Sequence, residues 1–305
     1  MLKRELKINF KSFMIWTFLL ITLFLAIFLM YPSIIKSDNI EMMNEMVKMF
    51  PEEMLKAFNL DISSMDTAFG WLKTEGFIFV LLITGIYSSI LGSSILLKEE
   101  SDKTIEYLNS LPIKRTTILS QKIISALFYI TLMVLVIGIF NYIGLTLSGE
   151  FDKKQYILLS ITPILSSLPL FAINLFISTF FHKTKHTFGI SLGTAFVSYI
   201  LQILAEINEV TEYFKYFTVY TLADIRNVIQ NISINPLMII ISIIITIIFI
   251  IGSYIRYDKK ELIWKSPLQK AYENNCLMPW KVDFYWLSDV IMLSYVAKRG
   301  GFLYD

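Results

Sequence analysis

The chain has 305 residues, of which 55% are hydrophobic, and its mean hydropathy of +0.60 is too high for a soluble globular protein of this length. Its net charge of +2 is too small to indicate binding to nucleic acid. Its one cysteine, Cys276, excludes an intrachain disulfide framework and a metal site built from a cluster of cysteines.

Six apolar stretches are long enough to cross a membrane as helices, because about 20 helical residues cover the hydrocarbon core. The charged residues lie between these stretches and not within them. The sequence therefore predicts an all-α membrane protein with six transmembrane helices in a domain at 1–265. The predicted spans lie at about residues 13–31, 76–97, 123–147, 156–181, 187–205 and 236–254.

Basic residues predict which side of the membrane each connection occupies. Lys3, Arg4, Lys7 and Lys11 precede the first span, and no small-residue cleavage site follows it. We therefore expect a retained helix and not a signal peptide. Lysine and arginine also gather after the second, fourth and sixth spans. Because basic connections stay on the cytoplasmic side, we expect both termini in the cytoplasm.

Small residues predict close helix packing in two spans, either within the chain, which is favoured, or against a second subunit. They are Gly85, Ser89 and Ser93, with Ser88 and Gly92 beside them, in the second span, and Gly189 and Gly193 in the fifth.

The fourth span contains Pro163 and Pro169. A proline frees a backbone carbonyl and kinks a helix, which is tolerated where neighbours satisfy the freed group. A purely structural bend is favoured, and a kink lined by polar residues that forms part of a cargo path is the alternative. The candidate cargo-path residues are Asn141, Ser166, Ser167 and Asn174.

The connection between the second and third spans, residues 98–115, has an amphipathic pattern. Ile105, Leu108 and Leu111 recur at i, i+3 and i+6, which predicts one apolar stripe of a short helix. Pro112 ends that helix, and acidic residues suit its first turns. We expect an amphipathic helix at the membrane surface, and an ordinary charged loop is the alternative. The expected first turns contain Glu99, Glu100, Asp102 and Glu106.

The pattern Glu-Glu-x-x-x-Thr-Ile-Glu-x-Leu-x-x-x-Pro-Ile-x-Arg runs from Glu99 to Arg115. It resembles the cytoplasmic coupling segment of ABC-2-type transporter permeases, which joins the second and third membrane helices and docks on an ATPase subunit. Many members carry glycine before the threonine, whereas this chain has Lys103. That difference favours the helix, because glycine is a poor helix former.

The resemblance covers about residues 1–263 and implies a half-transporter of the bacterial cytoplasmic membrane. Two copies, or one copy and a paralogue, would pair with two ATPase subunits, and export follows from the resemblance alone. Apolar residues of the segment would seat in an ATPase groove, with charged residues on its rim. The residues that the resemblance assigns to ATPase coupling are Glu99, Glu100, Thr104, Ile105, Glu106, Leu108, Leu111, Pro112 and Arg115.

The sequence holds no phosphate-binding loop of the Gly-x-x-x-x-Gly-Lys-Ser/Thr type, so the chain is not expected to be an enzyme, and ATP would bind to the partner. His182 and His186 flank a basic turn without further ligands, so no metal and no cofactor are expected. Cargo identity stays open, and the absence of intramembrane charge slightly favours apolar or amphipathic cargo.

Two other functions remain as alternatives. A non-transporting membrane anchor or sensor would recruit a cytoplasmic partner through residues 98–115. An ion-coupled carrier would need ionisable groups near the membrane centre, and the predicted span cores lack them. Residues 266–305 differ in composition from the spans and form a tail of unclear origin.

Overall fold

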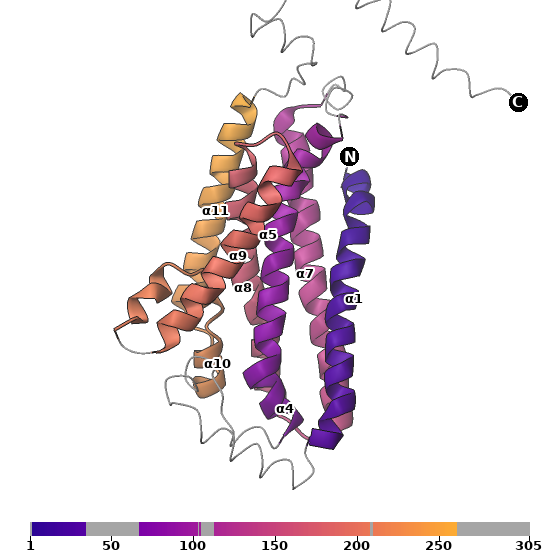
Figure 1. Cartoon of the computed structure of the whole chain (residues 1–305), viewed down its shortest axis with the longest axis vertical. Coiled ribbons are helices and arrows are strands. Elements are labelled where there is room, and N and C mark those ends of the chain that lie inside the picture. The colour runs from indigo at the N-terminus through magenta and orange to yellow at the C-terminus, as the bar shows by residue number, and fades with distance from the viewer. Residues whose placement is uncertain (1, 35–66, 103, 105–112, 208–209, 261–305) are drawn as a thin grey trace, which may run out of the picture. The chain divides into compact units, whose positions relative to one another are not determined.

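The computed structural model describes residues 2–34, 67–102, 104, 113–207 and 210–260 (Figure 1). Among them, six helices are long and apolar enough to cross a membrane, and no β-strand is present in the described ranges. These helices overlap the six predicted spans in order, so the all-helical architecture is confirmed. They are α1 (Leu2–Ile34), α5 (Phe77–Ser101), α7 (Arg115–Ser148), α8 (Lys153–Ser178), α9 (Thr184–Ile207) and α11 (Pro236–Lys259).

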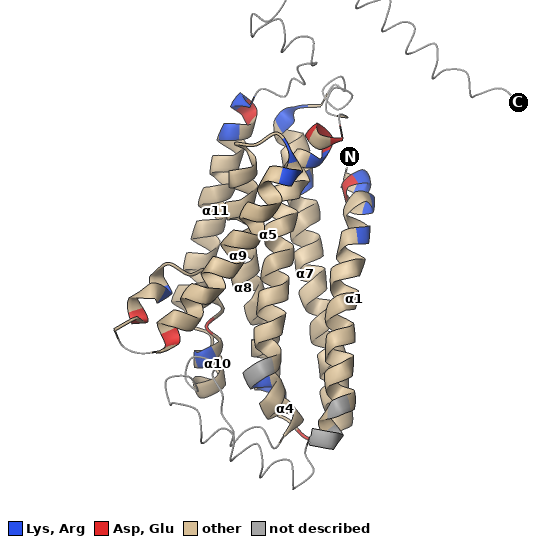
Figure 2. Ribbon diagram, viewed as in Figure 1, with Lys and Arg blue, Asp and Glu red and all other residues tan. Residues whose placement is uncertain are grey.

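The helices alternate in direction, so the starts of α1, α7 and α9 lie with the ends of α5, α8 and α11 (Figure 1). Figure 2 shows lysine and arginine gathered at this end, which we call the basic end. The side of the membrane on which it lies stays a prediction. Its basic residues in the described ranges are Lys3, Arg4, Lys7, Lys11, Lys98, Lys114, Arg115, Lys122, Lys183, Lys185, Arg256, Lys259 and Lys260.

Short elements cover the opposite end of the bundle. They are α4 (Ala68–Trp71), a π-helical turn η2 (Leu72–Gly76), the 3₁₀ turns η3 (Glu212–Tyr216) and η4 (Tyr220–Ala223), and α10 (Ile225–Asn231).

Polar side chains cap the first turns of two of the long helices. Asp152 Oδ1 accepts hydrogen bonds from the amides of Lys154 and Gln155 at the start of α8. Asn235 Oδ1 accepts from the amide of Leu237 at the start of α11. Such caps satisfy amides that have no partner within the helix, so they stabilise the starts of both helices, which lie at the opposite end.

The core is formed where α8 packs against α5, α11 and α7, while α1 packs on α7 and α9 packs on α5. Helix α5 is largely buried, whereas α1, α9 and α11 expose broad apolar faces. Within a membrane such faces meet lipid tails or further apolar helices, so their exposure in a single chain carries no penalty.

The small residues of α5 pack within the chain. A Cβ at Gly92 would lie 2.4 Å from the carbonyl oxygen of Phe171 in α8, and a Cβ at Gly85 would overlap the hydroxyl end of the Tyr220 side chain. This confirms the favoured intrachain use of the stripe at these two positions. A Cβ added at Gly189 or Gly193 would have no described atom within 4 Å beyond the backbone of its own helix, so nothing in the described part of the chain packs closely on that second motif.

Hydroxyl groups satisfy the carbonyls that the two prolines of α8 leave free. Pro163 has no N–H to donate to the carbonyl of Leu159, which accepts a hydrogen bond from Thr162 Oγ1 at 2.8 Å. The carbonyl of Leu165, freed by Pro169, accepts from Ser242 Oγ of α11 at 2.6 Å. Helix α8 therefore continues through both prolines, and the second also links it to α11.

Candidate functional site

The last turn of α5 lies at the basic end and leads into the segment between α5 and α7. We expected Glu99 and Glu100 in the first turns of a separate amphipathic helix, and that placement is wrong. Helix α5 continues through Ser101, and the amide of Thr104 then donates to the carbonyl of Glu99 at 2.9 Å. Both glutamate side chains point into the bundle, and Glu99 is only 3% exposed to solvent.

Glu99 belongs to a buried ion cluster that joins three helices. Lys122 Nζ of α7 donates to Glu99 Oε1 at 2.6 Å, to Glu5 Oε2 of α1 at 3.2 Å and to the carbonyl of Ile95 at 2.9 Å. An ammonium group has three N–H bonds, so every one of them has an acceptor. Lys122 is only 1% exposed, and we call this set of residues the Lys122 cluster.

Charge in the Lys122 cluster explains why α5 can end on glutamates. Negative charge is unfavourable at the carboxyl end of a helix, where the helix dipole is itself negative. Lys122 places a cation against Glu99 and so offsets that repulsion. Its own burial is tolerated because it is paired and fully hydrogen-bonded, which is the condition under which buried charges occur.

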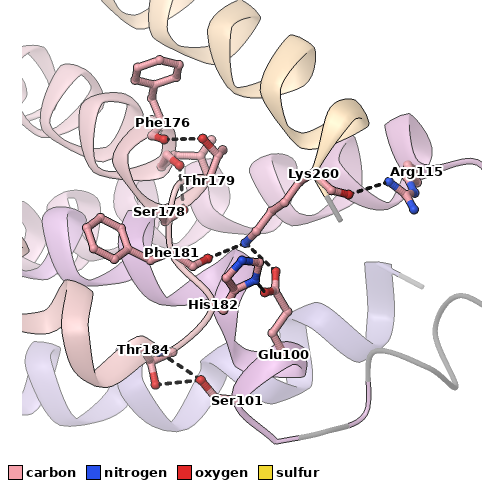
Figure 3. Close-up of polar contacts among 11 residues, drawn as sticks. Glu100, Ser101, Arg115, Phe176, Ser178, Thr179, Phe181, His182, Thr184 and Lys260 are labelled. Carbon is pink, nitrogen blue, oxygen red and sulfur yellow. Dashed lines mark hydrogen bonds and ion pairs between the residues drawn. The ribbon is translucent and has the colours of Figure 1, made fainter. Parts of the chain in front are cut away.

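Glu100 forms a second cluster on another side of the same turn (Figure 3). Its Oε1 accepts from Lys260 Nζ at 2.6 Å, and its Oε2 lies 2.9 Å from Nδ1 of the exposed His182. Lys260 directly follows α11 and also donates to the carbonyl of Phe181 between α8 and α9. Burial lowers the pKa of the Lys260 ammonium, and the Glu100 carboxylate partly opposes that effect.

Ser101 and Arg115 complete the contacts around this turn (Figure 3). Ser101 Oγ accepts from the amide of Thr184 at 3.0 Å and lies 3.2 Å from its hydroxyl, which joins α5 to the start of α9. Arg115 Nη1, at the start of α7, donates to the carbonyls of Asp258 and Lys260 at 3.2 and 3.0 Å. Those carbonyls lie at the end of α11, where the helix dipole favours a cation.

Three consecutive residues therefore connect the end of α5 to the ends of its neighbours. Glu99 reaches α7 and, through Lys122, α1. Glu100 reaches the residue after α11 and the turn between α8 and α9, and Ser101 reaches α9. If this turn moves, either these bonds break or the neighbouring helices move with it. We therefore call it the joint turn. It consists of Glu99, Glu100 and Ser101.

Residues 2–262 match the sequence model of a family described as ABC-2 family transporter protein. The chain belongs to this family. No curated protein and no solved structure matches it. With six apolar helices in the described ranges, it is a multi-pass membrane permease of the ABC-2 transporter type, and proteins of this family are generally non-catalytic membrane components.

The structure of the ABC-2 permease places four of the nine predicted coupling residues. Glu99 and Glu100 face the bundle, Thr104 is exposed after the joint turn, and Arg115 is half-buried against the end of α11. Engagement of the two glutamates and Arg115 within the chain differs from the free rim charges that we expected. The other predicted coupling residues lie outside the described ranges: Ile105, Glu106, Leu108, Leu111 and Pro112.

The four predicted cargo-path residues are buried but do not converge. Asn141 of α7 adjoins Tyr142, whose ring packs on Tyr156 of α8, whereas Asn174 lies 18 residues further along α8, or about 27 Å at 1.5 Å per residue. Asn174 is satisfied by the carbonyl of Leu170 and by Thr194 Oγ1.

The two serines of this set also pack within α8. Ser166 donates to the carbonyl of Pro163 at 3.2 Å. The hydroxyl of Ser167 is buried, and no hydrogen-bond partner for it exists among the described residues. The arrangement is typical of internal packing, and a cargo role for the four residues stays a prediction.

Sequence reasoning missed the buried role of Glu5, Lys122 and Lys260. The positive-inside rule treats Lys122 only as part of a basic flank, and it gives no role to Glu5 among its basic neighbours. A signal was present in α1, where Glu5, Asn9, Phe13 and Thr17 recur every four residues and all are buried. An acidic residue that continues such a stripe predicts a buried charge in need of a cationic partner.

Proposed function

We propose that this permease is the membrane subunit of an ATP-driven exporter and that a separate ATPase subunit docks on residues 99–115. Permeases of this family usually work with an ATPase subunit. Two copies of the chain, or one copy and a paralogue, would enclose the transport path. ATP would bind to the partner subunit, and the chain itself would carry no cofactor.

The proposed orientation puts the basic end in the cytoplasm of a bacterium, with the chain in the plasma membrane. The positive-inside rule supports this side, since the connections at the basic end carry most of the described lysines and arginines (Figure 2). The ATPase subunit would then meet the segment that follows the joint turn.

The observation that carries the proposal is the set of bonds around the joint turn. In the coupling model an ATPase pushes on the segment between α5 and α7, which the resemblance assigns to docking. A loose segment would absorb that push. Here the segment begins at a turn that is bonded to α7, α9 and the end of α11, and it ends at Arg115, which is bonded to α11 as well. Movement of the segment is therefore transmitted to several membrane helices at once.

The apolar stripe of the segment is expected to provide the docking affinity. Leu108→Asp would place a charge at the centre of that stripe, where apolar anchors contribute most of an interface's energy. We expect this variant to lose co-purification of the ATPase and transport, while the chain still inserts into the membrane. The measurement is a tagged pull-down from the native membrane followed by an ATPase assay.

Asn109→Asp is the matched control, because it introduces the same charge one residue away from the predicted stripe. It should retain the ATPase. If Leu108→Asp behaves like the control, the docking model is wrong. A partner that binds without ATP-driven flux would favour the anchor or sensor, and flux from the purified chain alone would favour an ion-coupled carrier.

Transmission through the joint turn can be separated from docking. Glu100→Gln keeps an oxygen that can accept from Lys260 but removes the charge from the pair. We expect the ATPase to co-purify normally, while ATP-driven transport falls at least about fivefold, the lower limit of typical coupling between sites. Glu150→Gln, exposed at the opposite end, is the control. Normal transport by Glu100→Gln would contradict transmission through this pair.

A further inference from the structure

A cavity of about 360 Å³ lies at the end of the bundle opposite the joint turn. Its walls come from the starts of α5 and α11, from the end of α9, and from η3, η4 and α10. This volume falls within the range of small-molecule sites, which is roughly 300–1,000 Å³. None of the four predicted cargo-path residues lines it.

The cavity combines an apolar wall with charged groups of both signs. The apolar side chains include Leu81, Ile203 and Met238. Figure 2 shows acidic and basic residues near the end of α9 and around α10, away from the basic end. The charged residues that line the cavity are Glu206, Glu212, Lys215, Asp224 and Arg226.

A chain of hydrogen bonds holds part of the charged wall in place. Thr221 Oγ1 donates to Gln202 Oε1 at 2.7 Å, and Gln202 Nε2 donates to Glu206 Oε1 at 2.7 Å. Glu206 Oε2 lies 3.2 Å from Arg226 Nη2. These bonds join η4, α9 and α10, so the carboxylate and the guanidinium are oriented before any ligand arrives. Preorganised groups of this kind reduce the cost of ordering on binding.

We propose that this cavity binds the zwitterionic headgroup of a phospholipid. Arg226 and Lys215 suit the phosphate, since a guanidinium or ammonium forms charge-assisted hydrogen bonds with phosphate oxygens. Glu206 and Glu212 suit the ammonium group of the same headgroup. The apolar wall takes the first methylenes of the acyl chains.

The surroundings favour a phospholipid over a water-soluble zwitterion. Helices α9 and α11, which contribute to the cavity, expose apolar side chains such as Val197, Ile200 and Leu237 along their outer faces. Lipid tails would cover these faces in a membrane, so a headgroup at the membrane boundary needs only a short movement to reach the cavity. This inference concerns binding alone and does not rest on the proposed export function.

The test is isothermal titration of the full chain in an uncharged maltoside detergent with dihexanoyl phosphatidylethanolamine. Dihexanoyl phosphatidylglycerol, with the same chains and no ammonium group, is the comparison lipid. We expect the zwitterionic lipid to bind at least about tenfold more tightly, because one charge-assisted contact is lost with the anionic lipid. Arg226→Gln should weaken binding of the zwitterionic lipid by a similar factor.

Two further variants keep the test decisive. Ile203→Trp changes only the apolar wall and leaves the charged residues in place. Its larger side chain should occupy the cavity and abolish binding. Lys153→Gln removes an exposed charge at the same end but outside the cavity and should bind like the unmodified chain. The thermal unfolding of each ligand-free variant reports whether it is folded. Equal affinity for both lipids, or unchanged binding by folded Arg226→Gln, overturns the proposal.

Discussion

Replacing Lys122 by methionine is expected to destabilise the folded permease by about 3–5 kcal/mol, the cost of removing one partner from a buried ion pair. The side chain of Lys122 is 1% exposed, and those of Glu5 and Glu99 are 2% and 4% exposed. Without the ammonium, the carboxylates of Glu5 and Glu99 would remain buried without their cationic partner. Methionine keeps most of the side-chain volume, so the loss reflects charge and hydrogen bonding more than a cavity.

Thermal unfolding of the detergent-purified protein, followed by size-exclusion chromatography, measures this effect. Lys154→Met is the control, because Lys154 is an exposed lysine at the opposite end of the bundle. It should unfold at the temperature of the unmodified protein. A Lys122→Met protein that unfolds with the control would show that the cluster contributes nothing to stability.

A triple variant tests whether the cost arises from unpaired charge. Combining Lys122→Met with Glu5→Met and Glu99→Met replaces all three charged groups by apolar side chains of similar size. Apolar replacement of a complete buried ion cluster is often close to neutral for stability, so most of the lost stability should return. The effects would then be strongly non-additive, as expected for residues in one network.

The membrane helices could be predicted because the bilayer imposes their length and composition. A helix that crosses hydrocarbon must satisfy its own backbone and needs about 20 apolar residues, so apolar stretches show directly in the sequence. The helix ends could not be predicted in the same way. Glu99 and Glu100 suit a helix start by local rules, yet α5 ends on them because Lys122 and Lys260 offset the charge.

The candidate site was predictable in position but not in detail. The motif from Glu99 to Arg115 drew attention to the connection between α5 and α7, because a family resemblance depends on residue order, and a coupling role for it stays a prediction. Which way a charged side chain points depends on partners that are distant in the chain. Lys260 pairs with a residue 160 positions earlier, and Arg115 bonds carbonyls more than 140 positions away. No local pattern identifies such partners.

The two glycine motifs show the same limit in helix packing. Sequence reasoning singled out Gly92 with the α5 stripe and, separately, the repeat of Gly189 and Gly193. Residue spacing alone predicts close helix packing equally for both sets. Only the first faces a described helix, because small-residue spacing allows close approach without specifying that a partner is present.

Replacing Gly92 by alanine is expected to destabilise the fold by about 1–3 kcal/mol, the usual cost of overpacking a core. The new Cβ would lie 2.4 Å from the carbonyl oxygen of Phe171 and 3.2 Å from the amide nitrogen of Leu175. Both are backbone atoms of α8, so no side chain can rotate away to relieve the contact. Helices α5 and α8 must separate, and valine should cost more than alanine.

Gly193→Ala provides the matched comparison, since the methyl group that it adds would have no described atom within 4 Å beyond the backbone of its own helix. Alanine is a better helix former than glycine by about 1 kcal/mol, so this variant should unfold at the same or a higher temperature. The comparison separates helix propensity from packing, because the propensity gain is common to both variants. Equal unfolding temperatures for the two variants would mean that α5 and α8 do not approach closely at Gly92. The predicted order, with Gly92→Ala below the unmodified protein and Gly193→Ala at or above it, requires that close contact.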